Sequence, residues 1–161
     1  MNVIQYPNLE ALVQYHPYHM ITFADHAGTT RECFAAILEG KEVLYPEEAE
    51  RIARLTGVPS SVLLLPSLVL LDPKREKHRR MMIELVFTYE AGKKYVDSCG
   101  GAQWSRCMDY DGLILDDLIY KYKAGKASYM EYRGLAEHIK HDVMFAEYAA
   151  RKEKQRRNHR G

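Results

Sequence analysis

Apolar residues recur at helical spacing along most of the chain, and nothing in the pattern resembles a β-sheet. In the N-terminal part this spacing predicts five helices, over residues 8–14, 19–26, 30–39, 46–57 and a short stretch that starts at Ser60. Asn8 and Ser60 are residue types that cap helices, and Pro46 suits a first helical turn. The pattern therefore predicts an all-α fold that begins with five helices.

The second and third predicted helices are joined by a tight turn at Gly28, because glycine supplies the left-handed backbone that such a turn needs. Thr29 or Thr30 caps the next helix, and Thr29 with Glu32 also has the spacing of a capping box. The inner face of that helix would consist of Phe34, Ile37 and Leu38. Its opposite face is then free to meet solvent or a partner.

Prolines mark a boundary at residues 66–73, beyond which the spacing predicts three more helices, over residues 77–97, 111–123 and 129–156. We expect a helix-turn-helix domain over residues 1–66, a linker or docking segment over 67–73 and a helical domain of about three helices over 74–161. The middle of the linker, Leu68–Leu71, is apolar. It fits a short strand, a docking segment or a dimer contact, and periodicity does not choose among them.

Three stretches of the N-terminal part carry a resemblance to a known family. They are Ala24–Thr30 around the turn glycine, Glu39–Lys41 after the third helix, and Pro46–Ser60 with its Ile-Ala-Arg-Leu-Thr-Gly-Val-Pro-Ser run. Together with the helices between them, they resemble the lambda repressor-like (Cro-type) helix-turn-helix family of phage and bacterial regulators over about residues 8–65. The resemblance implies a five-helix DNA-binding domain. Residues 74–161 resemble no family.

In that family the third helix enters the major groove, and its first turns contact base edges. By position, the resemblance assigns base contacts to Thr30, Arg31, Glu32, Ala35 and Ala36, and a phosphate contact to Lys41. Arg31 can form two hydrogen bonds with a guanine edge, and Glu32 can accept one from a cytosine amino group. The second helix often starts with a phosphate-binding Gln in this family, whereas Met20 or Ile21 stands there in this chain.

Charge is distributed unevenly along the chain. Residues 1–71 carry four Lys/Arg against eight Asp/Glu, a net of −4, whereas residues 72–161 carry a net of +5. Affinity for DNA comes largely from neutralised phosphates, and strong binders make about 6–10 such contacts. Arg31 and Lys41 alone would supply about two. The alternative interpretation is that Arg31 and Glu32 only solvate an exposed helix face.

Two basic clusters account for the positive half. The first contains Lys74, Arg75, Lys77, Arg79 and Arg80, and the second contains Arg151, Lys152, Lys154, Arg156 and Arg157. Cations at the start of a helix oppose the helix dipole, so the first cluster predicts an anionic partner. That partner is nucleic-acid phosphate, an acidic protein groove or the acidic N-terminal domain itself. The alternative to an anionic partner is that the first cluster is a solvated helix end and the second cluster is a frayed tail.

No catalytic constellation is evident, so we do not expect an enzyme, and no cofactor is implied. The spacing of Cys33, Cys99 and Cys107 fits neither a disulfide framework nor a zinc site. His138 and His141 share a helix face, but without a third ligand we expect no metal site. The chain has no apolar stretch of membrane-spanning length and no signal-peptide pattern, which predicts a cytoplasmic protein.

Two functional hypotheses remain. The first is a phage or prophage-type transcriptional regulator that binds operator double-stranded DNA as a homodimer, with the helical C-terminal domain mediating dimerisation or sensing a partner. The second is a phage-encoded inhibitor of a host defence system, similar to anti-CRISPR proteins, that binds a protein or ribonucleoprotein through residues 74–161. The two functions can coexist, with the N-terminal domain repressing its own operon. Eight of the twelve tyrosines lie beyond residue 88. Tyrosine is enriched at protein interfaces, but it is also common in half-buried core positions.

Overall fold

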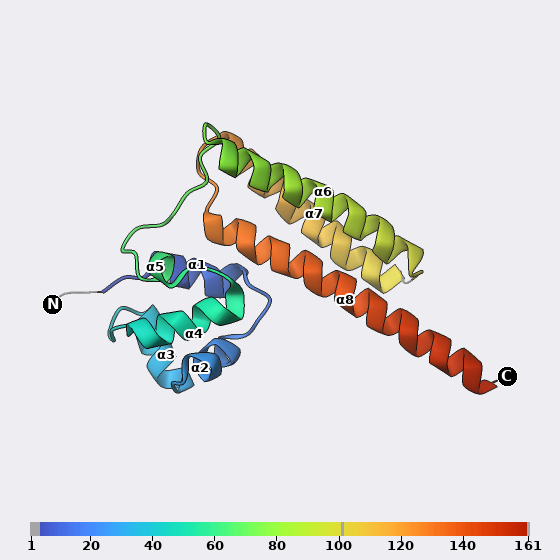
Figure 1. The fold of residues 1–161 in the computed structure, drawn as a ribbon, viewed down its shortest axis with the longest axis horizontal. Helices are drawn as coiled ribbons and strands as arrows, with labels where there is room; N and C mark the ends of the chain where they lie inside the picture. The colour runs from blue at the N-terminus through green and yellow to red at the C-terminus, as the bar shows by residue number, and fades with distance from the viewer. Residues whose placement is uncertain (1–3, 101, 161) are drawn as a thin grey trace. The chain divides into compact units, whose positions relative to one another are not determined.

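The computed structural model describes residues 4–100 and 102–160. Over those residues the chain forms eight helices and no strand, which confirms the expected all-α fold (Figure 1). None of these helices is both long enough and apolar enough to cross a membrane. The helices group into two compact units.

The first unit consists of the chain through Leu70 together with Ser128–Gly134. Its helices are α1 (Pro7–Tyr15), α2 (Met20–Ala27), α3 (Arg31–Leu38), α4 (Pro46–Thr56) and α5 (Ser60–Leu63). Each begins and ends within about one residue of its predicted range. The predicted cap of the last one is wrong, because Pro59 occupies the cap position of α5 and Ser60 is already helical.

Every helix of the first unit contributes to one core. Phe23 of α2 and Phe34 of α3 stack with their ring centroids 6.3 Å apart. Around them lie the buried side chains of Leu9, Leu12, Ile37, Ile52 and Leu63. Met130, from the first turn of α8 (Tyr129–Arg160), is buried in the same cluster. α3 turns one side, which carries Phe34 and Ile37, toward this common core.

Asn8 is not the cap of α1 that its residue type suggests, because Tyr6 takes the cap position. Asn8 is buried, and its side-chain nitrogen donates to the carbonyl oxygens of Val62 at 3.1 Å and Ser67 at 2.8 Å. Its side-chain oxygen accepts from the Val69 N–H at 2.9 Å. A buried amide is stable only when its polar atoms are hydrogen-bonded. Asn8 therefore anchors a distant extended segment to α1.

The apolar segment at residues 68–71 is not a strand of a sheet among the residues that the structure describes. Leu70 and Ser128 form one isolated antiparallel bridge. The Tyr129 N–H donates to the carbonyl oxygen of Val69 at 2.9 Å. These backbone bonds attach the residues at the start of α8 to the first unit.

The first turns of α8 belong to the first unit, whereas the sequence analysis places them in the C-terminal domain. Arg133 donates from Nη2 to the carbonyl oxygen of Thr56 at 2.7 Å. Gly134 lies so close to α1 that a Cβ on it would stand 2.5 Å from the carbonyl oxygen of Tyr15. The helical pattern of α8 is continuous, so the sequence does not show that the helix changes packing partners along its length.

The second unit contains Leu71–Ala127 and the part of α8 from Leu135 onward. Its other helices are α6 (Glu76–Ser98) and α7 (Ala102–Lys123). These two run antiparallel and side by side (Figure 1). Gly92 of α6 lies at the contact between the three helices, because a Cβ there would be 3.3 Å from a methyl group of Val143 on α8 and 3.5 Å from Met108 on α7.

The start of α7 was predicted at Asp111, whereas the helix begins at Ala102. Although apolar Trp104, Cys107 and Met108 have helical spacing, the Gly100-Gly101 pair just before these residues predicts a loop. Met108 is nevertheless fully buried. Its carbonyl oxygen also accepts a hydrogen bond from the Tyr89 hydroxyl of α6 at 2.9 Å. Contacts with α6 therefore stabilise the additional turns.

Two carboxyl groups meet inside the second unit. Asp111 of α7 is buried and shares a hydrogen bond with Asp142 of α8. Burial, together with the hydrogen bond and the negative charge of Asp142, raises the pKa of Asp111 to about 8. Burial also raises the pKa of two neighbours, the Tyr89 hydroxyl and the Cys107 thiol. The carboxyl pair therefore retains a proton at neutral pH.

Gly134→Ala is expected to destabilise the protein by about 1–3 kcal/mol, because the added methyl group meets the backbone of Tyr15, which cannot move aside. Thermal unfolding followed by circular dichroism measures the change. Gly92→Ala is the matched control, since its nearest neighbour is a movable side-chain methyl group and alanine favours the helix. Equal losses in the two variants would contradict the close approach at Gly134.

Stability is expected to fall as the pH rises from about 4 to about 8. The folded state keeps the proton of Asp111 over this range, whereas the unfolded chain, with an Asp pKa of 3.8, releases it. Asp111→Asn mimics the protonated side chain, so it should remove this dependence. At about 1.4 kcal/mol per pKa unit, it should add at least about 2 kcal/mol to the free energy of unfolding near pH 8.

Urea unfolding near pH 5 and near pH 8 provides the measurement for Asp111→Asn. Asp117→Asn is the control, because the Asp117 carboxylate is 60% exposed and pairs with Lys121 at 3.1 Å. We expect this control to change stability little at either pH. If the wild type and Asp111→Asn differ by the same amount at both pH values, the shared proton is refuted.

Candidate nucleic-acid interface

The turn between α2 and α3 is built around Gly28. Its φ of 81° is left-handed, and the next N–H, that of Thr29, donates to the Ala24 carbonyl oxygen at 3.0 Å. Arg51 of α4 donates from Nη1 to the carbonyl oxygen of Ala27 at 2.9 Å. A Cβ on Gly28 would stand 2.5 Å from the same Arg51 nitrogen. The left-handed backbone therefore requires glycine here, and a larger residue would also displace the end of the Arg51 side chain.

α3 begins directly after this turn, with Thr30 as its N-cap. The Thr30 hydroxyl accepts a hydrogen bond from the Cys33 N–H at 3.1 Å, which decides between the two threonines that the sequence offers as caps. As at any helix start, the first N–H groups lack partners within the helix and lie at the positive end of its dipole. The start of α3 therefore suits an anionic partner.

The two faces of α3 differ in exposure. Phe34 and Ile37 are buried. On the other side lie the exposed Thr30, Arg31 and Glu32 and the half-buried Ala35 and Ala36. With about 3.6 residues per turn, positions 31, 32, 35 and 36 share the face opposite the two buried side chains. The residues predicted to contact bases therefore lie together on one open surface.

Lys41 follows α3 and is exposed, but it is not unpaired. Its Nζ lies 3.0 Å from Oε2 of Glu39, and the two side chains are 73% and 59% exposed. An exposed ion pair of this kind is worth about 0–1 kcal/mol, so a phosphate group can replace Glu39 at little cost. Arg31, by contrast, forms no ion pair with another residue that the structure describes.

The first basic cluster is partly neutralised by the chain itself. Arg79 donates from Nη1 to the carbonyl oxygens of Pro73 at 3.2 Å and Lys74 at 3.0 Å. Arg80 pairs with Glu76 at 2.8 Å. Groups at the start of α6 thus satisfy part of the charge of these two arginines, and the contact of the cluster with an external anion stays a prediction.

Three cations of the same cluster, Lys74, Arg75 and Lys77, have exposed side chains. His78 adds no charge at neutral pH. Its Nδ1 accepts from the Asp72 N–H at 2.8 Å, and burial together with the nearby Arg75 lowers the pKa of His78. Besides Arg79 and Arg80, the cluster thus offers two lysines and one arginine to solvent.

The second basic cluster lies on the last turns of α8, which stays helical through Arg160 instead of fraying. Arg156 and Arg157 both approach Glu153, at 2.8 Å and 3.6 Å. The other cations of the cluster are the exposed Arg151, Lys152 and Lys154. These positions form a largely solvated basic helix end.

Other candidate chemistry is limited in the part of the chain that the structure describes. Within it, no group of three or more His, Cys, Asp or Glu side chains is placed to hold a metal ion. All three cysteines are free thiols. The groups that gather at the outer face of α3 are a hydroxyl, a guanidinium and a carboxylate, which bind partners through hydrogen bonds.

The sequence analysis missed the structural roles of Arg51 and Arg79. Both look like cations available to a partner, yet each donates to backbone carbonyl oxygens. For Arg51 the partner lies 24 residues away in the sequence, and no local pattern marks such a contact. The cationic charge that remains for an anionic ligand is therefore smaller than the composition suggests.

Comparison with known proteins finds no matching family, no matching curated protein and no matching solved structure. The resemblance of residues 8–65 to the lambda repressor-like family therefore stays a prediction from the residues themselves. The role of α3 in binding is accordingly a proposal, argued from the geometry of this chain.

Thr30→Ala is expected to lower the free energy of unfolding by about 1 kcal/mol, because it removes the side-chain cap of α3. Urea unfolding provides the measurement. Thr29→Ala is the matched control, since it removes the same group one residue earlier and leaves the cap in place. A larger loss for Thr29→Ala than for Thr30→Ala would show that the cap is assigned to the wrong threonine.

Proposed function

We propose that the chain is a helix-turn-helix transcriptional regulator that binds operator DNA through α3. One observation carries the proposal. α2 and α3 are joined by a left-handed turn at Gly28, and α3 exposes Arg31 and Glu32 opposite the buried Phe34 and Ile37. A helix held in this way can enter the major groove, which is about 12 Å wide, with its first turns toward the bases.

Each side chain on the outer face has a distinct part in this proposal. Arg31 forms two hydrogen bonds with a guanine, which discriminates against other bases by about 1–3 kcal/mol. Glu32 accepts from a cytosine amino group. Ala35 and Ala36 are small, so they let the helix approach closely and offer methyl contacts to thymine. Lys41 and the N–H groups at the start of α3 bind phosphate.

Additional phosphate contacts are needed, because the acidic first unit provides few. The exposed Lys74, Arg75 and Lys77 and the basic end of α8 supply them in this proposal. Association as a homodimer doubles every contact and lets the protein read two half-sites about 34 Å apart. Dimerisation thus compensates for the low DNA affinity of a single chain in this proposal.

Selection of bound duplexes from a randomised library by the full chain tests the proposal. We expect an inverted repeat whose half-sites are about one helical turn apart. Arg31→Ala should weaken binding to the selected duplex by at least about tenfold and relax the preference for one base. Lys41→Ala should weaken binding to all duplexes alike and lower the slope of log K against log salt by about 1.8, because the dimer loses one phosphate contact, worth about 0.9, in each of its two copies.

Lys126→Ala is the matched control for loss of one positive charge. Lys126 is exposed in the turn before α8 and has no part in the proposed interface. Its removal should leave both affinity and base preference unchanged. Selection of no sequence, or equal binding by Arg31→Ala and the wild type, would refute the proposed role of α3.

A second candidate function is inhibition of a host defence system by binding a protein or ribonucleoprotein, as anti-CRISPR proteins do. The net charge of −4 over residues 1–71 favours it, because this charge opposes approach to DNA. The exposed cations of residues 74–77 suit the phosphates of a ribonucleoprotein. Affinity purification from bacterial lysate, beside the duplex selection, separates the two. A stable complex together with failed duplex selection would favour the inhibitor.

A further inference from the structure

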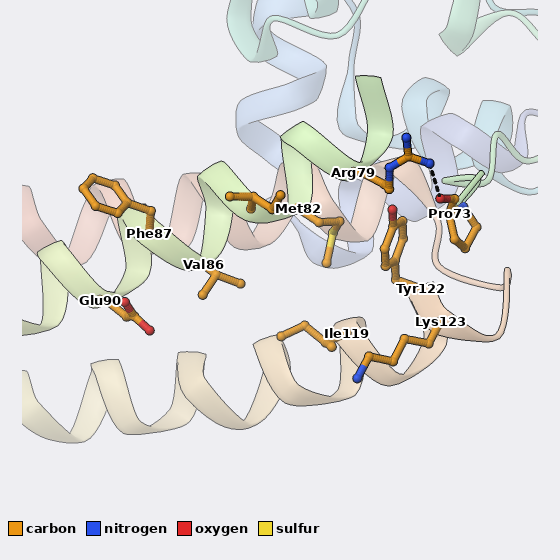
Figure 2. Close-up of a pocket in the computed structure, with 10 residues that line it drawn as sticks. Pro73, Arg79, Met82, Val86, Phe87, Glu90, Ile119, Tyr122 and Lys123 are labelled. Atoms are coloured by element: carbon orange, nitrogen blue, oxygen red, sulfur yellow. Dashed lines mark hydrogen bonds between the residues drawn. The ribbon is translucent and has the colours of Figure 1, made fainter. Parts of the chain in front are cut away.

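An apolar groove lies between α6 and α7 in the second unit (Figure 2). Met82, Val86 and Phe87 of α6 border it on one side, and Ile119 and Tyr122 of α7 border it on the other. Contiguous apolar surface of this kind is uncommon on proteins that act as single chains, and it marks sites of association.

Two bordering side chains of α6 are far more exposed than apolar residues usually are. Ile83 is 68% exposed and Phe87 is 71% exposed. They lie one helical turn apart, so together they form a ridge along the edge of the groove. A surface that carries both a ridge and a groove can pack against a copy of itself, with each ridge in the other copy's groove.

The two ends of the groove carry opposite charge. Arg79 and Lys123 line one end, whereas Glu90 lines the other, about three turns further along α6 (Figure 2). Asp116 is exposed about two turns before Lys123 on α7, toward the acidic end, because α7 runs antiparallel to α6. The charge therefore changes sign from one end of the groove to the other.

We propose that this groove is the surface through which two copies of the chain associate, in an antiparallel, two-fold arrangement. An axis midway between Arg79 and Glu90 sets the cationic end of each copy on the acidic end of the other. Ile83 and Phe87 then lie on either side of the axis, and each enters the opposite groove. α6 and α7 of both copies complete a four-helix bundle.

The charge pattern distinguishes a second copy from other occupants. A peptide or protein surface of one charge would match one end of the groove and be repelled at the other. An identical copy, turned by half a rotation, matches both ends. Arg79 can take part although one of its nitrogens binds carbonyl oxygens, because a guanidinium has five N–H donors.

This inference extends beyond the proposed function. The surface of self-association consists of residues of the second unit alone. Two copies can therefore associate through it whether or not α3 binds DNA. Its test accordingly needs no nucleic acid.

Sedimentation of the full chain at micromolar concentration, without DNA, measures the association. The wild type should be a dimer, and Phe87→Glu should raise the dissociation constant by at least about tenfold. Phe87 is exposed in the single chain, so its substitution should leave the circular dichroism spectrum unchanged. Met144→Glu is the matched control, because Met144 is 55% exposed on α8 and lies outside the groove. It should remain a dimer.

Charge reversal tests the antiparallel pairing. Glu90→Lys and Lys123→Glu should each weaken the dimer. The double variant should recover it in part, because the carboxylate introduced at position 123 then meets the ammonium introduced at position 90 of the other copy, while Arg79 keeps its positive charge. A monomeric wild type, alone or bound to another macromolecule, would overturn the proposal. So would a dimer that persists in Phe87→Glu but dissociates in Met144→Glu. Loss of the dimer alongside intact Arg31-dependent duplex binding would refute this interface while leaving the DNA proposal standing.

Discussion

Burial of Phe34 and Ile37 on one side of α3 determines which side of that helix meets the surroundings. Phe34 stacks on Phe23 of α2, so the core holds the rotation of α3 about its own axis. The left-handed backbone at Gly28 lets the chain turn sharply enough for this stacking. The outward position of Arg31 is thus a consequence of packing in the core, and the proposed binding surface depends on that packing being tight.

Several cationic side chains of this protein form intramolecular hydrogen bonds that stabilise the fold. Arg51, Arg79 and Arg133 each donate to backbone carbonyl oxygens at the ends of other segments. These hydrogen bonds supply donors to carbonyl oxygens that have no partner within their own helix or turn. A guanidinium group suits such oxygens because it carries several N–H donors. The charge left for an anionic ligand is correspondingly small. In the proposed function, association of two copies doubles the surface that contacts DNA, and the groove between α6 and α7 is the proposed site of that association.

The helices of the first unit are predictable because their signals are local: Pro46 starts a helix, and Gly28, Gly40 and Gly57 end others. The failures of prediction share a different cause. Asn8 looks like a cap, yet its amide binds a segment more than fifty residues away. The glycine pair at residues 100 and 101 predicts a loop, yet the first turns of α7 are helical because α6 supports them. In both cases a distant partner outweighs the local preference.

For the candidate site, the helical period alone places positions 31, 32, 35 and 36 on one face, and residues within one or two turns suffice for that inference. The spacing of apolar residues likewise predicts the all-α class, and the positions of the charged residues give the opposite charges of the two halves of the chain. These sequence patterns do not show which arginines donate to backbone carbonyl oxygens. They also do not show that the first turns of α8 join the N-terminal core, or that an apolar groove with oppositely charged ends lies between α6 and α7. These features arise where residues far apart in the chain come into contact, and such contacts exist only in the folded molecule.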